Sequence, residues 1–463
     1  MQRRRSISAS LTMPSTRHVY GYDCGRLDYD LPYNADHEAI SPIPKDDLLP
    51  PKISSPSSPS SANAWYYSRS VPIIFPDDLH PLPKRILDNG MDLLYFHYFV
   101  NYTSTALVTS SCTSNPFRTI LPRLALEDEN FMGLILAYAS CHRACLLDYP
   151  EPVNRIAQWV HRLFPTFREA ITSGRPISDS VFGMSVMLAS FSQSFPSAFD
   201  LPISWSQHLK MAHTMCSSVA MRKDRPRSAA SLFFLRWFGY LDTFGNCSGV
   251  IYDGSDPQDW SRPLLYEAVD PSYRCLTGHT TKSLVLLSSV AQLARRCDRQ
   301  RNVKTGIPLS AMSLSQQLRC KLELRTLEIA YEKYDCSCTT ELSSSQTLRS
   351  VNGALCYTAL VFLHRKVHKL HSGAPLVQNC VRGILHCLNS YEPVVEIPDI
   401  ILSLFIAACE VQSPFERQYV MERLEAIGNA GMAQVKRRVL PLLRDILSSG
   451  GDWTGLETEI LLG

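Results

Sequence analysis

Apolar residues recur at helical spacing along most of this 463-residue chain, and this periodicity restricts the possible fold more than any other feature. In MDLLYFHYFV, residues 91–100, the apolar side chains form a broad stripe, which predicts a helix that is buried on one side. Short breaks with proline, glycine or serine separate similar segments from about residue 83 onward. No segment shows the convincing alternation of a strand. The sequence therefore predicts an all-α fold, with one large multi-helix domain over residues 83–463.

The N-terminal region has a different composition. Twelve of the 30 prolines lie in the first 83 residues, beside the low-complexity segment PKISSPSSPSSANAW at 51–65. Proline at this density supports neither a continuous helix nor a central strand. We therefore predict a disordered tail over residues 1–82. The pairs Ser55-Pro56 and Ser58-Pro59 are candidate phosphorylation sites, although a plain flexible tail is the simpler interpretation.

The overall composition indicates a globular protein without a charge-driven partner. Hydrophobic residues make up 45% and charged residues 19%, and the formal net charge is only +3. The 15 cysteines lack the dense, regular spacing of a disulfide scaffold, so we predict reduced thiols in an intracellular protein. No apolar run follows the N-terminal arginines, which excludes an ordinary secretory signal peptide. The most apolar stretch, at 400–409, is half as long as a membrane-spanning helix of about 20 residues, so no membrane partner is expected.

The segment YASCHRACLLDY places Cys141, His142 and Cys145 within five positions, which raises the question of a metal site or a catalytic thiol. On a helix all three residues fall on the apolar stripe. The adjacent side chains of Cys141 and His142 diverge by about 100°, so a single ion would meet only one of them together with Cys145. Burial in the core as small apolar and singly hydrogen-bonded side chains is the simpler prediction.

A second candidate metal site lies in HRKVHKLH, where His364, His368 and His371 share one helical face. The arginine and lysines between them would repel a cation, and no carboxylate lies nearby in the sequence to support the ligands. We therefore predict the basic C-terminal end of a helix, favoured by the helix dipole.

Three further groups lack the pattern of a known active site. They are His208 with His213 in HLKMAH, the acidic run 127–129, and Cys336 with Cys338. The first is not an HExxH motif, the second is typical of a helix start, and the third is too short to chelate well. GxGxxG, Walker, GxSxG and paired CxxC motifs are also missing from the sequence. We predict no catalytic, cofactor-binding or metal-ligating residues, and no cofactor.

An ordered series of motifs resembles the fungal-specific transcription factor domain, which follows the zinc binuclear cluster in many fungal regulators. Each motif alone is little more than an apolar helix, so the specificity comes from their order, and the resemblance covers about 85–448. The motifs are the segment 95–146 with its Asn115-Pro116-Phe117 turn, SWSQHLKMAH, FFLRWFGYLDTFGNCSG, LLSSVAQLARRCD and LFIAACEVQSPFERQYVMERL.

The resemblance implies a helical regulatory domain in a nuclear regulator of transcription, usually of pathway-specific genes for nutrient use or secondary metabolism. It implies no catalytic residues. A small-molecule effector would bind between helices, and the partners would be other transcription regulators or a second copy, paired through the helical domain.

This chain departs from the family in its DNA-binding module, which needs Cys-x2-Cys-x6-Cys twice. Only Cys24 precedes residue 95. The chain is either a member without the module or an incomplete version of one, and direct DNA binding is expected only if the module is missing from this sequence.

Two other functions stay open. The first is an all-α metabolic enzyme of the isoprenoid type, and the second is a sensor that titrates another regulator without binding DNA. The enzyme would be supported by paired acidic motifs such as Asp-Asp-x-x-Asp, which this sequence lacks.

Overall fold

The helical periodicity is realised as helices throughout the part of the chain that the computed structural model describes. This part comprises residues 73–108, 115–195, 205–220, 228–247, 278–301, 309–331, 342–390 and 400–455, together with 19–20. Its strands are β1 (Val19–Tyr20) and β2 (Ile73–Ile74), which form a two-residue antiparallel pair. The predicted all-α fold is confirmed. The Ser-Pro pairs at 55–59, Cys24 and the CSC segment lie outside the described residues.

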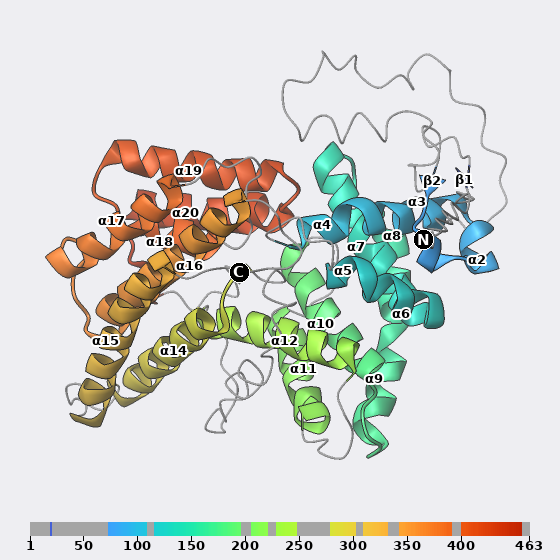
Figure 1. Cartoon of the computed structure of the whole chain (residues 1–463), viewed down its shortest axis with the longest axis horizontal. Coiled ribbons are helices and arrows are strands. Elements are labelled where there is room, and N and C mark those ends of the chain that lie inside the picture. Colours follow the sequence, from blue (N-terminus) through green and yellow to red (C-terminus); the bar gives the residue numbers. More distant parts are fainter. Residues whose placement is uncertain are drawn as a thin grey trace, which may run out of the picture.

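The helices form two groups along the chain, which we call the N-lobe (residues 73–247) and the C-lobe (residues 278–455). The N-lobe, blue to green in Figure 1, contains η3 (Asp77–Leu79), α2 (Lys84–Leu87), α3 (Gly90–Tyr98), η4 (Phe99–Thr103), α4 (Ser104–Ala106), α5 (Pro116–Thr119), α6 (Leu121–Glu127), α7 (Glu129–Leu147), α8 (Val153–His161), α9 (Leu163–Thr172), α10 (Asp179–Ser194), α11 (Trp205–Ala220) and α12 (Ala229–Cys247).

The C-lobe, yellow to red in Figure 1, contains α14 (Thr281–Arg301), α15 (Leu309–Tyr331), α16 (Leu342–Phe362), η6 (Leu363–Val367), α17 (Pro375–Asn389), α18 (Ile401–Glu410), α19 (Pro414–Asn429), η8 (Val435–Val439), α20 (Leu440–Ser449) and η9 (Trp453–Gly455). Helix α12 packs against α10 and α11 in its own lobe and against α14 in the other. It therefore links the two lobes along the lower edge of Figure 1.

Local sequence signals set the starts of the N-lobe helices. The Asn115 side chain accepts a hydrogen bond from the backbone N–H of Phe117 at 2.9 Å, and Pro116 occupies the first helical position. Asp128 caps α7 in the same way, accepting from the N–H groups of Asn130 and Phe131. Such side chains satisfy N–H groups that have no partner within the helix. The second of these helix starts is the one that the acidic run 127–129 predicts.

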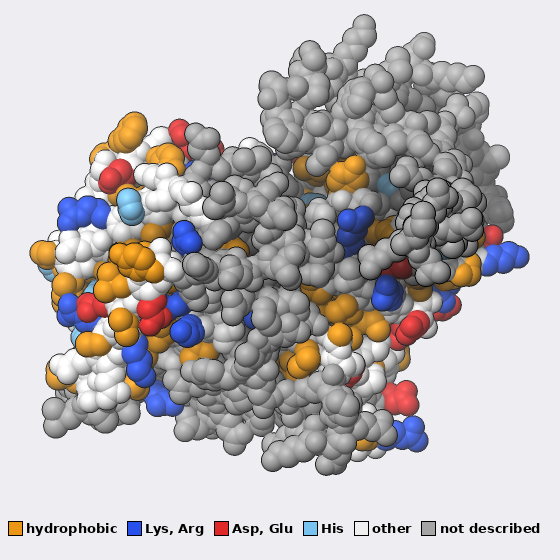
Figure 2. Space-filling view, viewed as in Figure 1, with side chains coloured by type: hydrophobic (Ala, Val, Ile, Leu, Met, Phe, Trp, Pro, Cys, Tyr) orange, Lys and Arg blue, Asp and Glu red, His pale blue; other side chains and the backbone are white. Residues whose placement is uncertain are grey.

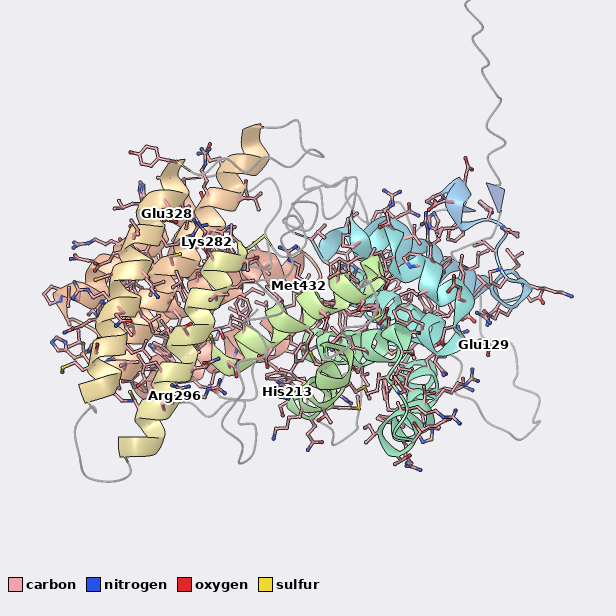
Figure 3. All side chains as sticks on the ribbon, turned by 60° about the horizontal axis from the view of Figure 1, so that its bottom comes forward. Glu129, His213, Lys282, Arg296, Glu328 and Met432 are labelled. Carbon is pink, nitrogen blue, oxygen red and sulfur yellow. The ribbon has the colours of Figure 1, made fainter. Side chains whose placement is uncertain are left out.

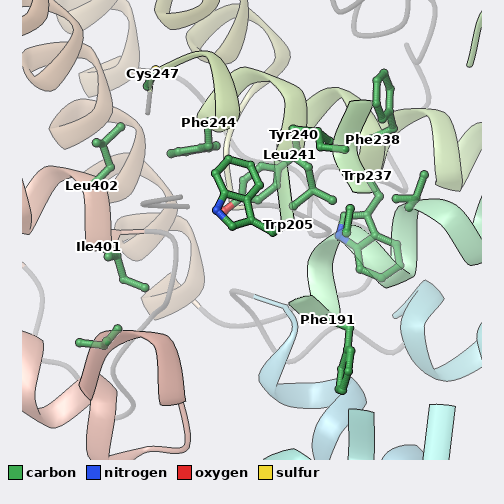
Figure 4. Close-up of a cluster of buried hydrophobic side chains, with 14 of the residues drawn as sticks. Phe191, Trp205, Trp237, Phe238, Tyr240, Leu241, Phe244, Cys247, Ile401 and Leu402 are labelled. Atoms are coloured by element: carbon green, nitrogen blue, oxygen red, sulfur yellow. The ribbon is translucent and has the colours of Figure 1, made fainter. Parts of the chain in front are cut away.

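The core is continuous across both lobes and rich in aromatic rings. In Figure 4, α12 supplies Trp237, Phe244 and other rings, while Ile401 and Leu402 reach the same region from α18. Helix α10 approaches α12 closely at Gly183, where an added Cβ would lie 2.3 Å from the ring of Phe234. A larger side chain at this position would force the two helices apart.

The start of the helical domain lies earlier in the chain than the predicted residue 83. Phe75, Leu79 and Leu82 have exposed fractions of 5% or less and belong to the hydrophobic core. The Phe75 ring stacks on Phe96 with 5.3 Å between ring centroids. The predicted disordered tail is therefore corrected for residues 75–82, which are part of the packed domain.

We expect a sharp difference between two N-terminal deletions. Deleting residues 1–72 should leave the melting temperature nearly unchanged, because it spares every buried side chain described in the domain. Deleting residues 1–82 removes three buried apolar side chains, each contributing about 1.5–3 kcal/mol, and should lower the melting temperature strongly. Thermal unfolding of both proteins measures this. Equal melting temperatures would mean that Phe75, Leu79 and Leu82 contribute nothing to stability.

Candidate functional site

The Cys141-His142-Cys145 group lies on α7 and takes part in the core, as the sequence predicts. Cys141 is fully buried, His142 is buried and Cys145 is half-buried. Burial raises the pKa of both thiols, which disfavours the thiolate that acts as a nucleophile. The His142 ring instead shares a hydrogen bond of 3.1 Å with the hydroxyl of Thr103, through Nδ1, and packs edge-on against Tyr98.

The second ring nitrogen of His142 faces the other lobe. At Gly431, in the turn between α19 and η8, an added Cβ would lie 2.8 Å from Nε2 of His142. The backbone of Gly431 has φ +105°, a conformation that favours glycine. This turn therefore approaches α7 closely because residue 431 has no side chain and adopts an unusual backbone conformation.

Two polar contacts beside His142 also join the lobes. The Gln193 amide on α10 donates to the Gln434 side-chain oxygen at 3.0 Å, and both side chains are buried. Arg437 on η8 donates to Glu151, between α7 and α8, at 2.6 Å. We call this group the lobe junction; it comprises His142, Glu151, Gln193, Gly431, Gln434 and Arg437. Directional polar contacts thus join the two lobes here.

The lobe junction is expected to make stability depend on pH through His142. Burial lowers the pKa of His142 from 6.5 to about 4. Below pH 6.5 the unfolded chain binds a proton at this residue that the folded chain does not bind until about pH 4, so stability falls as the pH falls across this window. At pH 5 the loss from this residue is about 2 kcal/mol.

Urea unfolding at pH 7 and pH 5 checks this expectation. The variant His142→Gln should lose about 2 kcal/mol less than the wild-type protein between the two pH values, whatever its stability at pH 7. Identical pH dependence in the two proteins would contradict the assignment of a neutral, buried His142.

The HRKVHKLH segment ends its helix where the sequence predicts, but its side chains point to different environments. Helix α16 continues into η6, which ends at Val367. His364 is buried, His368 is half-buried and His371 is exposed, so the three rings do not share one site. Burial and the neighbouring His368 lower the pKa of His364 to about 4. The predicted basic helix end is confirmed, with His364, Arg365 and Lys366 in the last turn of η6, and its arginine is buried.

Arg365 lies at the centre of a buried ionic cluster. Its Nε donates to Oε1 of Glu410 at 2.6 Å, and its Nη2 donates to Asp452 at 2.8 Å. The indole N–H of Trp453 donates to the same Glu410 oxygen. Lys366 lies over the Trp453 ring, at 5.8 Å from its centroid. The cluster attaches the C-terminal segment 452–455 to η6 and α18.

The remaining candidate residues from the sequence take part in ring packing or in helix capping. His208 is buried, with its ring stacked on Phe164 at 6.5 Å, and burial lowers its pKa to about 4. His213 is half-buried beside the ring of Phe238. In the acidic run Glu127, Asp128 and Glu129, the middle carboxylate caps α7, as predicted for a helix start. Among the described residues, no group of three His, Cys, Asp or Glu side chains has a metal-binding arrangement. None of the described helices is long and apolar enough to cross a membrane.

The fold and the lobe junction define a large helical domain whose two lobes share one hydrophobic core and are also joined by polar contacts. Comparison with known proteins identifies it further. The chain matches the fungal specific transcription factor domain over residues 94–446, and it therefore belongs to this family. No curated protein and no solved structure matches the chain. The resemblance inferred from the ordered motifs is confirmed, and the match includes most of both lobes and the whole lobe junction.

Proposed function

We propose that this chain regulates the transcription of pathway-specific genes in the nucleus and acts through its helical domain. The observation that supports this most strongly is the family match over 94–446, which includes most of both lobes. The described interior supports a binding or regulatory role, since its candidate nucleophiles and metal ligands are engaged in core packing and polar contacts.

Expression profiling of a strain that lacks this chain tests the proposal. We expect the transcripts of a limited set of functionally related genes to change, because the chain acts on transcription. A change in one metabolite without any change in transcripts would contradict the proposal and favour the all-α enzyme. Restoration of the transcripts when a second regulator is also deleted would favour a sensor that titrates that regulator.

We also expect that these 463 residues do not recognise a DNA site by themselves. Specific recognition needs many phosphate contacts together with contacts to base edges. The cluster Arg3–Arg5 offers only a few phosphate contacts. In the face that Figure 2 shows, basic and acidic side chains are intermixed over the described surface, rather than gathered into a basic area. Binding should therefore be weak, independent of sequence and strongly reduced by salt.

Footprinting with the purified 463-residue chain at physiological salt checks this expectation. The expected result is no discrete protected site without a partner, and a protected site once a DNA-bound regulator is added. Protection of a discrete site by the chain alone would contradict it.

A further inference from the structure

Helix α15 exposes apolar side chains on the face opposite its core face. Its buried residues follow a 4-3 spacing and comprise Ala311, Ser315, Leu318, Leu322, Arg325 and Ile329. At 3.6 residues per turn, the opposite side of the helix carries Cys320, Leu324, Leu327 and Tyr331. These four residues are exposed, and we call them the α15 outer face. Leu327 is 65% and Tyr331 86% exposed.

The spacing of the α15 outer face is that of a coiled-coil seam. The four residues are separated by four, three and four positions, so they occupy successive d and a positions of a heptad repeat. These spacings of four, three and four positions are the same from either end of the helix. In an antiparallel pair of identical helices, Cys320 would therefore meet Tyr331 of the second copy, and Leu324 would meet its Leu327. Isolated exposed apolar residues are ordinary, but a regular seam of four is typical of a helix-binding surface.

The charges beside this seam favour one partner and one orientation. Lys321 and Glu328 occupy the two e positions, while Glu323 and Ala330 occupy the g positions. An antiparallel pair of copies places e beside e, so Lys321 of each copy meets Glu328 of the other, and Glu323 meets only alanine. A parallel pair places g beside e and brings Glu323 next to Glu328, a repulsive contact. Self-pairing is therefore complementary in charge only when the helices are antiparallel.

We propose that the α15 outer face binds the same face of a second copy of this chain in an antiparallel, two-fold symmetric contact. The position of α15 allows this, because it packs chiefly against α14 and α16 and forms an outer edge of the C-lobe. Figure 3 shows Glu328 beside Lys282 of α14, at the border of this edge, where the two side chains form an ion pair of 3.8 Å. The inference deepens the proposed function, since it names the surface through which the helical domain pairs.

The contact is small, and it predicts a reversible dimer. Stable dimers bury about 800 Å² per partner, which exceeds what four side chains on one helix face offer. Sedimentation of the purified full chain over a range of concentrations should therefore show a monomer–dimer equilibrium. Leu327→Glu should weaken dimerisation at least about tenfold, because it places a charge in the apolar seam. Met312→Glu is the matched control: Met312 is also exposed on α15 but lies outside the seam, so this variant should dimerise like the wild-type protein.

Cysteine cross-linking tests the orientation. Cys320 of one copy lies opposite residue 331 of the other in the antiparallel pair, whereas two Cys320 residues lie about 16 Å apart along the helix axis. Tyr331→Cys should form a covalent dimer on mild oxidation, and the double variant Cys320→Ser/Tyr331→Cys should not. A covalent dimer of the wild-type chain that disappears in Cys320→Ser would show a parallel pair and overturn the proposal.

Three outcomes of the sedimentation experiment contradict the proposed surface. In the first, the chain stays monomeric at every concentration. In the second, Leu327→Glu leaves the dimer intact. In the third, the chain dimerises only after residues 1–72 are deleted, which would show that its own N-terminal segment covers the face. None of these depends on transcription. Failure of the proposed function would appear separately, as unchanged transcripts in the deletion strain.

Discussion

Replacing Glu410 by leucine is expected to lower the free energy of unfolding by about 3–5 kcal/mol, because it leaves Arg365 buried without its closest counter-charge. The Glu410 side chain is 1% and the Arg365 side chain 10% exposed, so water cannot replace the lost contact. The indole N–H of Trp453 also loses its acceptor. Urea unfolding of the purified protein measures the loss.

Two variants of the same cluster serve as controls for Glu410→Leu. Asp452 is half exposed, so Asp452→Asn should change stability by about 1 kcal/mol or less. The double variant Arg365→Met/Glu410→Leu removes both buried charges and should recover most of the stability that Glu410→Leu loses. A double variant that is less stable than Glu410→Leu would show that packing, and not the buried charge, determines the effect.

Replacing Trp237 by alanine should also cost about 3–5 kcal/mol, through lost contacts and the cavity that remains. Trp237 is 4% exposed, and its ring packs edge-on against Phe117 with 4.8 Å between centroids. The ring of Phe233 lies 5.7 Å away on the same helix. Because α12 links the two lobes, we expect the loss to affect the whole domain in one unfolding transition.

The control for Trp237→Ala is Phe415→Ala, which removes an aromatic ring that is 83% exposed on α19. Its expected effect is about 0.5 kcal/mol or less. If the two variants were equally stable, the aromatic contacts around Trp237 would not contribute to the stability of the folded domain.

The positions of the helices and of several helix ends could be predicted from the sequence because they depend on local spacing. Asn115 and Asp128 cap helices through backbone groups two or three residues away, and a stretch of sequence contains both partners. The burial of Cys141 and His142 follows from the same rule, since both lie on the apolar stripe of α7. The ordered motifs likewise identified the family, over limits close to the matched range.

The contacts between distant segments could not be predicted in this way. Arg365 and Glu410 are 45 positions apart, and Gln193 and Gln434 are 241 positions apart. No spacing rule relates such residues, so the HRKVHKLH segment predicts a basic helix end but not the carboxylate partners of its arginine. Phe75, Leu79 and Leu82 were assigned to the tail because the neighbouring prolines suggested disorder.

For helix α15, the sequence does not determine which face is buried. Its sequence predicts a helix, but both of two opposite faces carry several apolar residues, and periodicity alone does not tell which face is buried. The packing of α15 against α14 and α16 buries one face and leaves Leu324, Leu327 and Tyr331 exposed. The sequence by itself determined the all-α fold, the helix starts and the family, because local backbone and side-chain preferences act over a few residues. Only the tertiary structure decided the lobe junction, the buried ionic cluster and the exposed face of α15, because these depend on which helices meet.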